Sequence, residues 1–193
     1  MVIRTCALIC AYNEEETIAR AVGRTACFIP TYVIDDGSKD KTMENAKRAG
    51  AFVYSHETNR GKGDALKTGF EHFFKTNYEA IITLDADLQH PPEYIPQFIE
   101  KLDQNYDAVI GKRDFSTISV PLSRKIGNRL DSKILSKLLG QEIPDPQNGF
   151  RAFKKETLEK IIPNLTNSGF PYELELLIKM TKERYKIGWQ EIP

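Results

Sequence analysis

Residues 80–87 read Ala80-Ile81-Ile82-Thr83-Leu84-Asp85-Ala86-Asp87, an apolar run that ends in two carboxylates one residue apart. The run predicts a buried strand over 80–84, and carboxylates at the end of such a strand are costly to bury without a cation. Mg²⁺ and Mn²⁺ prefer such oxygen ligands and keep positions open for a substrate phosphate. We therefore expect Asp85, Asp87 and the nearby amide of Gln89 to hold the cation. The alternative is that the two aspartates only cap the turn after the strand.

An alternation of strands and helices leads up to this stretch. The pattern predicts strands over 5–11, 31–34 and 51–54, and helices over 13–24, 40–49 and 62–75. We expect Asn13 and Glu16 to open the first helix as a capping box. The β-α-β-α-β-α-β order predicts the α/β class, with a mostly parallel, twisted sheet and helices on both faces.

Polar clusters follow three of these four strands. They are Tyr12-Asn13-Glu14, Asp35-Asp36-Gly37-Ser38 and Asp85-Ala86-Asp87. Ligands of such sheets bind beyond the carboxyl ends of the strands, so we expect the clusters to converge on one crevice.

Two further segments of this half have residues suited to a nucleotide. A carboxylate such as Asp35 or Asp36 can accept a hydrogen bond from the ring N–H of uracil or guanine, which would select the base. The alternative for this pair is an Asx turn with a helix cap. Asn59-Arg60-Gly61-Lys62-Gly63 offers glycines for close backbone approach and two cations for phosphate, although its spacing is not that of a P-loop.

The pattern changes in the second half of the chain. It predicts helices over 91–102, 123–139, 156–162 and 172–183, strands over 108–111 and 186–192, and a short polar-aromatic segment over 145–153. No linker or repeat interrupts the chain, so we expect one domain over 1–193.

The helix expected over 123–139 combines an apolar stripe with basic residues. Residues 112–137 include seven Lys or Arg against two Asp. Arg113 and Arg124 are placed to face a pyrophosphate. The helix has the composition of a membrane-surface element. The alternative is an ordinary helix with leucines in the core and lysines in solvent.

The overall composition excludes several classes of function. Lys plus Arg and Asp plus Glu both number 27, which argues against a surface built to bind nucleic acid. No apolar run approaches the ~18 residues of a membrane span. The three cysteines fit reduced thiols. We expect a cytoplasmic protein that meets a membrane, if at all, from its cytoplasmic surface or through a segment that this chain lacks.

Four ordered motifs are spread across nearly the whole chain. They are Ala11-Tyr12-Asn13-Glu14, Asp35-Asp36-Gly37-Ser38-Lys39-Asp40, Asp85-Ala86-Asp87-Leu88-Gln89-His90-Pro91-Pro92-Glu93 and Asp145-Pro146-Gln147-Asn148-Gly149-Phe150-Arg151. Together they strongly resemble family 2 glycosyltransferases, most closely the dolichyl-phosphate mannose synthase and polyprenyl-phosphate glycosyltransferase branch.

The resemblance implies a GT-A fold and transfer of a hexose, with inversion at its anomeric carbon. The donor would be a nucleotide-diphosphate sugar of the GDP-mannose or UDP-glucose type, the cation Mg²⁺ or Mn²⁺, and the acceptor a polyprenyl or dolichyl phosphate. Residues 1–111 would form the nucleotide-sugar half and residues 112–193 the acceptor half. The residues implied to bind the donor and its cation are Ala11, Tyr12, Glu14, Asp35, Asp36, Lys62, Asp85, Ala86, Asp87, Gln89, Arg113, Arg124 and Arg151.

The acceptor side is expected to depend on a second group of residues. Arg113 and Arg124 match family positions that meet donor or acceptor phosphates, and Asp145, Arg151 and Glu175 match positions near the acceptor. A polyprenyl phosphate is already anionic and mainly needs orientation, so Asp145 is a base candidate only if the acceptor is a hydroxyl. With Asp87, residues Asp145, Arg113 and Arg124 are the predicted catalytic set.

The chain departs from the family pattern, and other functions remain as alternatives. Cys10 stands where the family usually has Pro, and relatives continue past Pro193. One alternative is a glycosyltransferase with a saccharide or other hydroxyl acceptor, and another is a sugar-nucleotide-binding module without catalysis. A third is a haloacid-dehalogenase-like phosphatase, but there the Asp-x-Asp motif follows the first strand and not the fourth.

Overall fold

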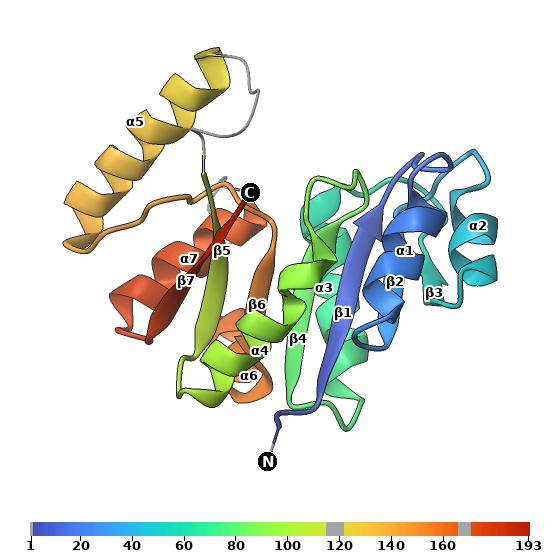
Figure 1. The fold of residues 1–193 in the computed structure, drawn as a ribbon, viewed down its shortest axis with the longest axis horizontal. Helices are drawn as coiled ribbons and strands as arrows, with labels where there is room; N and C mark the ends of the chain where they lie inside the picture. Colours follow the sequence, from blue (N-terminus) through green and yellow to red (C-terminus); the bar gives the residue numbers. More distant parts are fainter. Residues whose placement is uncertain (1, 115–121, 166–170) are drawn as a thin grey trace.

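A seven-stranded sheet in the order β3-β2-β1-β4-β6-β5-β7 forms the centre of the protein (Figure 1). The structure is a computed structural model that describes residues 2–114, 122–165 and 171–193, with 122–129 as helix backbone only. The strands are β1 (Thr5–Ala11), β2 (Thr31–Asp35), β3 (Phe52–Ser55), β4 (Ala80–Asp85), β5 (Ala108–Arg113), β6 (Arg151–Lys154) and β7 (Ile187–Ile192). β6 is antiparallel to both β4 and β5, and the other neighbouring strands are parallel.

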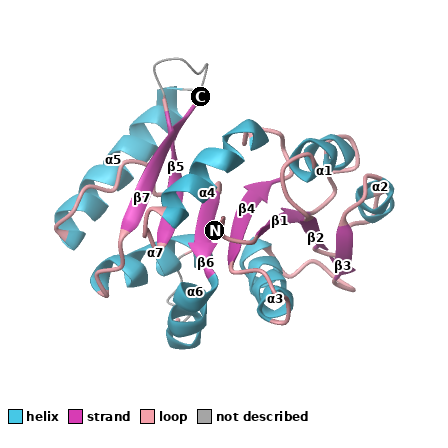
Figure 2. Ribbon diagram, turned by 60° about the horizontal axis from the view of Figure 1, so that its bottom comes forward, coloured by secondary structure: helices cyan, strands magenta, loops and turns pink. Residues whose placement is uncertain are grey.

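Helices cover both faces of this sheet (Figure 2). One face packs against α1 (Ile18–Ala26), α2 (Thr42–Arg48) and α4 (Ile95–Asp103), and the other against α3 (Lys62–Phe74), α6 (Lys155–Ile161) and α7 (Tyr172–Lys182). Two 3₁₀ helices, η1 (Pro92–Tyr94) and η2 (Ile162–Asn164), precede α4 and follow α6. Phe98 of α4 stacks on Phe150 with ring centroids 4.2 Å apart. The predicted α/β fold with a mostly parallel sheet is confirmed.

The start of α1 and the strand β6 differ from the prediction. The capping box at Asn13 was wrong: Asn13 has a φ of 54°, its Oδ1 accepts from the Lys39 N–H at 2.9 Å, and α1 begins only at Ile18. Side-chain bonding between two strand-end loops therefore replaces the first helical turn. The strand β6, within 145–153, was not predicted. It has only four residues and begins with the fully buried Arg151, so it shows no apolar run.

The long helix α5 (Leu122–Leu139) lies beside α7, away from the sheet (Figure 1). Its predicted apolar stripe divides into two faces. Leu135 and Leu139 pack toward Ile143 and Leu177. Leu130, Ile134 and Leu138 are 56%, 48% and 75% exposed. None of the helices in the described part of the chain has the length and apolarity needed to cross a membrane.

Candidate active site

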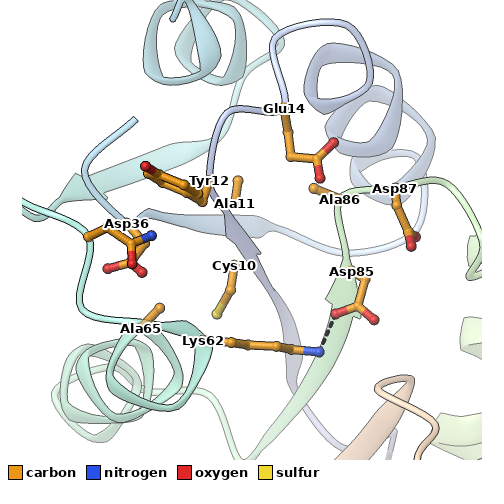
Figure 3. Close-up of a pocket in the computed structure, with 11 residues that line it drawn as sticks. Cys10, Ala11, Tyr12, Glu14, Asp36, Lys62, Ala65, Asp85, Ala86 and Asp87 are labelled. Carbon is orange, nitrogen blue, oxygen red and sulfur yellow. Dashed lines mark hydrogen bonds and ion pairs between the residues drawn. The ribbon is translucent and has the colours of Figure 1, made fainter. Parts of the chain in front are cut away.

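A cleft of about 410 Å³ opens where β1, β2 and β4 end and α3 begins (Figure 3). Its lining consists of Cys10, Ala11, Tyr12, Glu14, Asp36, Asn59, Lys62, Ala65, Asp85, Ala86 and Asp87. The three predicted strand-end clusters therefore converge, because parallel strands deliver their carboxyl ends to the same edge of the sheet. Tyr12 is 45% exposed at the mouth of the cleft, as a ring that stacks on a ligand needs to be.

Lys62 bridges two acidic residues at the floor of this cleft. Its Nζ lies 2.5 Å from Asp85 Oδ1 and 3.2 Å from Oε2 of Glu173, which comes from the first turn of α7. Burial opposes ionisation of Asp85, but the charge and hydrogen bond of Lys62, together with the charges of His90 and Arg151, hold the pKa of Asp85 below its ordinary value. Burial likewise disfavours the ammonium, yet Glu173 and Asp85 keep the pKa of Lys62 raised. At neutral pH the ammonium of Lys62 is therefore charged and lies between the carboxylates of Asp85 and Glu173.

Gly149 makes room for this ion pair. A Cβ at this position would lie 2.8 Å from Asp85 Oδ2 and 3.1 Å from Lys62 Nζ, so these two side chains would have to move to accommodate it. Gly149 lies in the loop between Asp145 and Arg151. At this position only backbone atoms approach Asp85 and Lys62.

Asp85 and Asp87 have different surroundings. Asp85 is half-buried, and its backbone N–H donates to His90 Nδ1 at 2.9 Å. The His90 ring therefore carries its proton on Nε2, 3.7 Å from Asp85 Oδ2, and burial lowers the pKa of His90. Asp87 is exposed, and its Oδ1 accepts from the Gln89 N–H at 3.0 Å. Asp87 therefore caps the turn after β4, which was the alternative to metal binding, and it also lines the cleft.

These two carboxylates fit a divalent cation of the Mg²⁺ or Mn²⁺ type. Hard cations take carboxylate oxygens and leave further positions to phosphate and water. Among the described residues, no group of three His, Cys, Asp or Glu side chains is arranged to hold a metal ion. Asp85 and Asp87 would therefore need phosphate oxygens of a ligand to complete the coordination.

Asp36 holds the loop before α3 by its carboxylate. Oδ1 accepts from the Arg60 N–H at 3.0 Å and contacts His56 Nδ1 at 2.7 Å, and Oδ2 accepts from the Gly61 N–H at 2.7 Å. The next residue, Gly37, has a φ of 75°, and a Cβ there would lie 2.5 Å from the backbone of Thr58. Asp36 thus positions Lys62 through the residue before it.

Asp35, although adjacent in sequence, lies outside the lining of the cleft. It is buried, its Oδ2 accepts from the Ser55 hydroxyl at 2.8 Å, and its Oδ1 has no partner in the described structure. Successive strand residues point to opposite faces, which separates Asp35 from Asp36.

Arg113, the last residue of β5, forms an ion pair with Asp145. Arg113 Nε lies 2.8 Å from Asp145 Oδ2, and Nη2 lies 2.9 Å from Oδ1. Asp145 is fully buried, and its hydrogen bond is the main cause that raises the pKa of Arg113. The charges of Asp85 and Asp87 also raise the pKa of Arg113, so its guanidinium lies within electrostatic reach of the cleft. Both Asp145 oxygens accept from Arg113, so the structure assigns Asp145 to this ion pair, and its role as a general base stays a prediction.

Arg151 supports the fold around the site and lies outside the lining of the cleft. Its guanidinium donates to three backbone carbonyls, those of Asn148, Glu173 and Pro146, at 2.6, 2.6 and 2.8 Å. Arg151 is 1% exposed, and burial lowers its pKa. These bonds fix the 145–150 loop against the start of α7, so the expected donor contact of Arg151 is not what the geometry favours.

The structure therefore separates the predicted donor-site residues into two groups. Eight of them line the cleft: Ala11, Tyr12, Glu14, Asp36, Lys62, Asp85, Ala86 and Asp87. Asp35, Gln89, Arg113 and Arg151 lie outside that lining, and the side chain of Arg124 lies outside the described residues. Gln89 is exposed in the turn after Asp87, which leaves its predicted role as a metal ligand without support from the cleft geometry.

Sequence reasoning missed Glu173. Glu173 and Glu175 both lie in the first turn of α7, and only Glu175 was predicted to lie near the acceptor. Acidic residues are common in first turns because they interact favourably with the helix dipole, so nothing local distinguishes Glu173. Its contact with Lys62 joins residues 111 positions apart, and only the fold brings them together.

Comparisons with known proteins identify the class of protein. Residues 6–162 match the model of Glycosyl transferase family 2, and the chain belongs to that family. It is 35% identical over 189 residues to an uncharacterised protein of Methanocaldococcus jannaschii, covering 95% of this chain and 77% of that one. It is also 30% identical over 211 residues to the UDP-N-acetylglucosamine–dolichyl-phosphate N-acetylglucosaminyltransferase of Methanococcus voltae, covering 96% and 82%.

A solved structure confirms the GT-A type of fold. Glucosyl-3-phosphoglycerate synthase from Mycobacterium tuberculosis, in complex with Mn²⁺, UDP-glucose and phosphoglyceric acid, superimposes with a TM-score of 0.76 at 22% identity. The match covers 98% of this chain and 70% of that one. The predicted membership of family 2 is thus confirmed.

Proposed function

We propose that this protein is an inverting glycosyltransferase that moves a sugar from a nucleotide-diphosphate donor to a polyprenyl or dolichyl phosphate. The observation that supports this most directly is the cleft in which Asp85 and Asp87 lie beside the Lys62 ammonium. Two carboxylates suit a divalent cation and an ammonium suits a phosphate, so the set matches a metal-bound diphosphate.

The donor would lie with its nucleoside between Tyr12 and the Asn59 loop and its diphosphate over Asp85 and Asp87. A Mg²⁺ or Mn²⁺ ion held by these aspartates would neutralise the charge that develops on the departing nucleoside diphosphate. Lys62 reaches the same region from α3 and would add a second positive charge. Tyr12 offers the exposed ring against which a base can stack.

A phosphate acceptor suits the acceptor side better than a hydroxyl activated by Asp145. Both Asp145 oxygens accept from Arg113 and the carboxylate is fully buried, which favours a role in holding that guanidinium over a role as a base. An anionic phosphate needs no base and would be oriented by Arg113 at the end of β5. The relative in Methanococcus voltae carries dolichyl phosphate in its name, which favours the same acceptor.

A hydroxyl acceptor is the second candidate, because Glu173 could serve as its base. Glu173 Oε2 pairs with Lys62, which lines the cleft, while the buried Oε1 has no hydrogen-bond partner within the described structure. That oxygen would act as the base for a hydroxyl that reaches it. Glucosyl-3-phosphoglycerate synthase, a structural neighbour, is named for a phosphoglycerate product, so such acceptors occur on this fold.

The helix α5 would bring the protein to the cytoplasmic face of the membrane, where a lipid-linked acceptor resides. Leu130, Ile134 and Leu138 form an exposed apolar row, and Lys133 and Lys137 lie exposed beside it. This arrangement is typical of a helix that lies in a membrane interface.

A transfer assay tests the proposed function. Radiolabelled UDP-N-acetylglucosamine, UDP-glucose and GDP-mannose are each incubated with Mn²⁺ and a polyprenyl phosphate, and label extracted into organic solvent is counted. We expect one donor to label the lipid, and the label to be absent in EDTA. Label transferred only to a soluble hydroxyl acceptor would favour the second candidate, and no transfer to any acceptor would favour a binding module.

A further inference from the structure

We propose that Lys62 is a resident counter-cation of the free enzyme: it occupies Asp85, one of the two carboxylates that a divalent ion needs, and releases it only when a diphosphate arrives. This inference rests on the proposed function and goes beyond it, because it assigns the free protein a mechanism that couples cation binding to donor binding.

The first argument is the position of the ammonium. Lys62 Nζ contacts Asp85 Oδ1 at 2.5 Å (Figure 3). It also contacts Glu173 Oε2 at 3.2 Å, so it joins the start of α3 to the end of β4 and the first turn of α7. It thus covers one oxygen of the more buried aspartate of the pair. A cation that bound Asp85 at that oxygen would lie beside a like charge, and such repulsion is strong at short range and doubles for a divalent ion.

The second argument is that the side chain can leave while its backbone stays. The Gly61 N–H donates to Asp36 Oδ2 at 2.7 Å, which fixes the residue before Lys62. The Lys62 side chain itself is 41% exposed and lines the open cleft. A lysine has four flexible methylene groups and three rotatable donors, so the ammonium can move from carboxylates to phosphate oxygens within the same cleft.

The third argument is the surplus of acidic groups that Lys62 neutralises. Asp85, Asp87 and Glu173 bring three carboxylates to this end of the sheet, and Glu173 Oε1 remains without a partner in the described structure. A diphosphate alone would be repelled by this group, and a cation alone would be repelled by Lys62. When both enter together, Lys62 exchanges carboxylate for phosphate and the cation takes its place on Asp85.

Such an exchange makes the two ligands cooperative. By linkage, whatever factor Mn²⁺ adds to nucleotide affinity, the nucleotide adds to Mn²⁺ affinity. For the wild type we expect Mn²⁺ to bind weakly alone and the mutual enhancement by Mn²⁺ and UDP or GDP to be ~10-fold or more.

The test uses Lys62→Gln, which removes the charge, and Lys62→Arg, which keeps it. Binding of Mn²⁺ alone is measured by calorimetry or by the electron paramagnetic resonance signal of free Mn²⁺, and UDP and GDP are titrated with and without Mn²⁺. In Lys62→Gln we expect Mn²⁺ alone to bind ~10-fold tighter than in the wild type, and the mutual enhancement to fall by a similar factor. Lys62→Arg should keep weak binding of Mn²⁺ alone.

The matched control is Lys179→Gln, which removes a partly exposed helical lysine paired with Glu183 at 3.0 Å on α7, away from the cleft lining. It should leave both affinities unchanged. An unchanged Mn²⁺ affinity in folded Lys62→Gln would overturn the inference. So would tight binding of Mn²⁺ alone to the wild type, a measurement that needs no variant.

The outcomes for this inference and for the proposed function are distinguishable. If the wild type binds neither UDP nor GDP in the presence of Mn²⁺, the proposed function fails and the exchange onto a diphosphate fails with it. If the wild type binds nucleotide with Mn²⁺ but Lys62→Gln leaves the affinity for Mn²⁺ alone unchanged, only the role of Lys62 fails.

Discussion

Arg113 at the end of β5 grips Asp145 with two side-chain hydrogen bonds of 2.8 and 2.9 Å, and the Arg113 backbone N–H adds a third at 3.2 Å. The carboxylate is fully buried, whereas the arginine side chain is 27% exposed. This geometry fixes the plane of the guanidinium. Asp145 is therefore a positioning residue for Arg113.

We expect Asp145→Ala to lower the free energy of unfolding by ~3 kcal/mol, because it removes the fully buried carboxylate and its hydrogen bonds with Arg113. The control is Glu191→Ala, which breaks the neighbouring pair Lys112–Glu191, whose glutamate is 81% exposed. That loss should be below ~1 kcal/mol. Urea unfolding measures both, and equal losses would contradict the role given to Asp145.

A second prediction concerns Asp36, which accepts from the backbone N–H groups of Arg60 and Gly61. Asp36→Ala removes these part-buried hydrogen bonds, at a cost of ~0.5–1.5 kcal/mol for each, so the melting temperature should fall. Nucleotide affinity should fall as well, because the loop that places Lys62 loosens. Thermal melts beside a nucleotide titration measure both, and a lost affinity with an unchanged melt would show that Asp36 acts on the base alone.

The ion pair between Arg24 and Glu93 predicts a pH dependence of stability. Arg24 Nη2 lies 2.8 Å from Glu93 Oε2, and this hydrogen bonding lowers the pKa of Glu93 from its ordinary 4.5. The folded state thus binds the Glu93 proton more weakly than the unfolded state. The contribution is complete above the ordinary pKa and is lost as the pH falls through the lowered one.

Glu93→Gln should therefore cost less than ~1 kcal/mol at pH 7, since Glu93 is 54% exposed and solvent screens the pair. Urea unfolding of wild type and variant at pH 7 and near pH 3 gives the comparison. The difference between the two proteins should shrink at the lower pH. A difference that stays constant or grows would contradict the assignment.

The exposed row on α5 predicts binding to anionic membranes. Lys133 and Lys137 flank the exposed Leu130, Ile134 and Leu138, and each basic residue near an anionic surface contributes ~1 kcal/mol. The protein should co-sediment with anionic vesicles but not with neutral ones, and salt should weaken the binding. Lys133→Glu with Lys137→Glu should abolish it.

The control for this experiment is Lys41→Glu with Lys47→Glu, the same charge change at exposed residues beside and within α2. It should change vesicle binding much less. If the wild type stays in the supernatant with anionic vesicles at low salt, α5 does not dock on membranes and a soluble acceptor is favoured.

The fold was largely predictable from the sequence because, in the first half of the chain, the local sequence patterns agree with the strands and helices of the structure. Alternating apolar runs and amphipathic segments defined β1 through β4 and the helices between them. β6 was not predicted because it is only four residues long. It pairs with strand residues that are far away in the chain, as Ala152 does with Ile82. Pairing of that kind depends on the surrounding sheet and leaves little local signal.

The site was predictable where it consists of strand ends. Tyr12, Asp36 and Asp85 reach the cleft because parallel strands end at one edge. What each side chain does there was not predictable, since it depends on partners distant in sequence. Asp36 bonds to the Arg60 loop, and Arg151 bonds to backbone carbonyls that no motif reveals.

The most direct test of the central claim, that this cleft binds a nucleotide-diphosphate sugar through a divalent cation, is calorimetric titration of the donor that supports transfer, with Mn²⁺ and in EDTA. Asp87→Ala is the informative variant, because Asp87 is exposed and, within the described structure, the one hydrogen bond that its carboxylate accepts comes from the Gln89 N–H in the turn. We predict binding with Mn²⁺ that weakens by ~10-fold or more, about 1.4 kcal/mol or more, both in EDTA and in Asp87→Ala. Equal affinity in EDTA, or an unchanged response to Mn²⁺ in Asp87→Ala, would contradict the account.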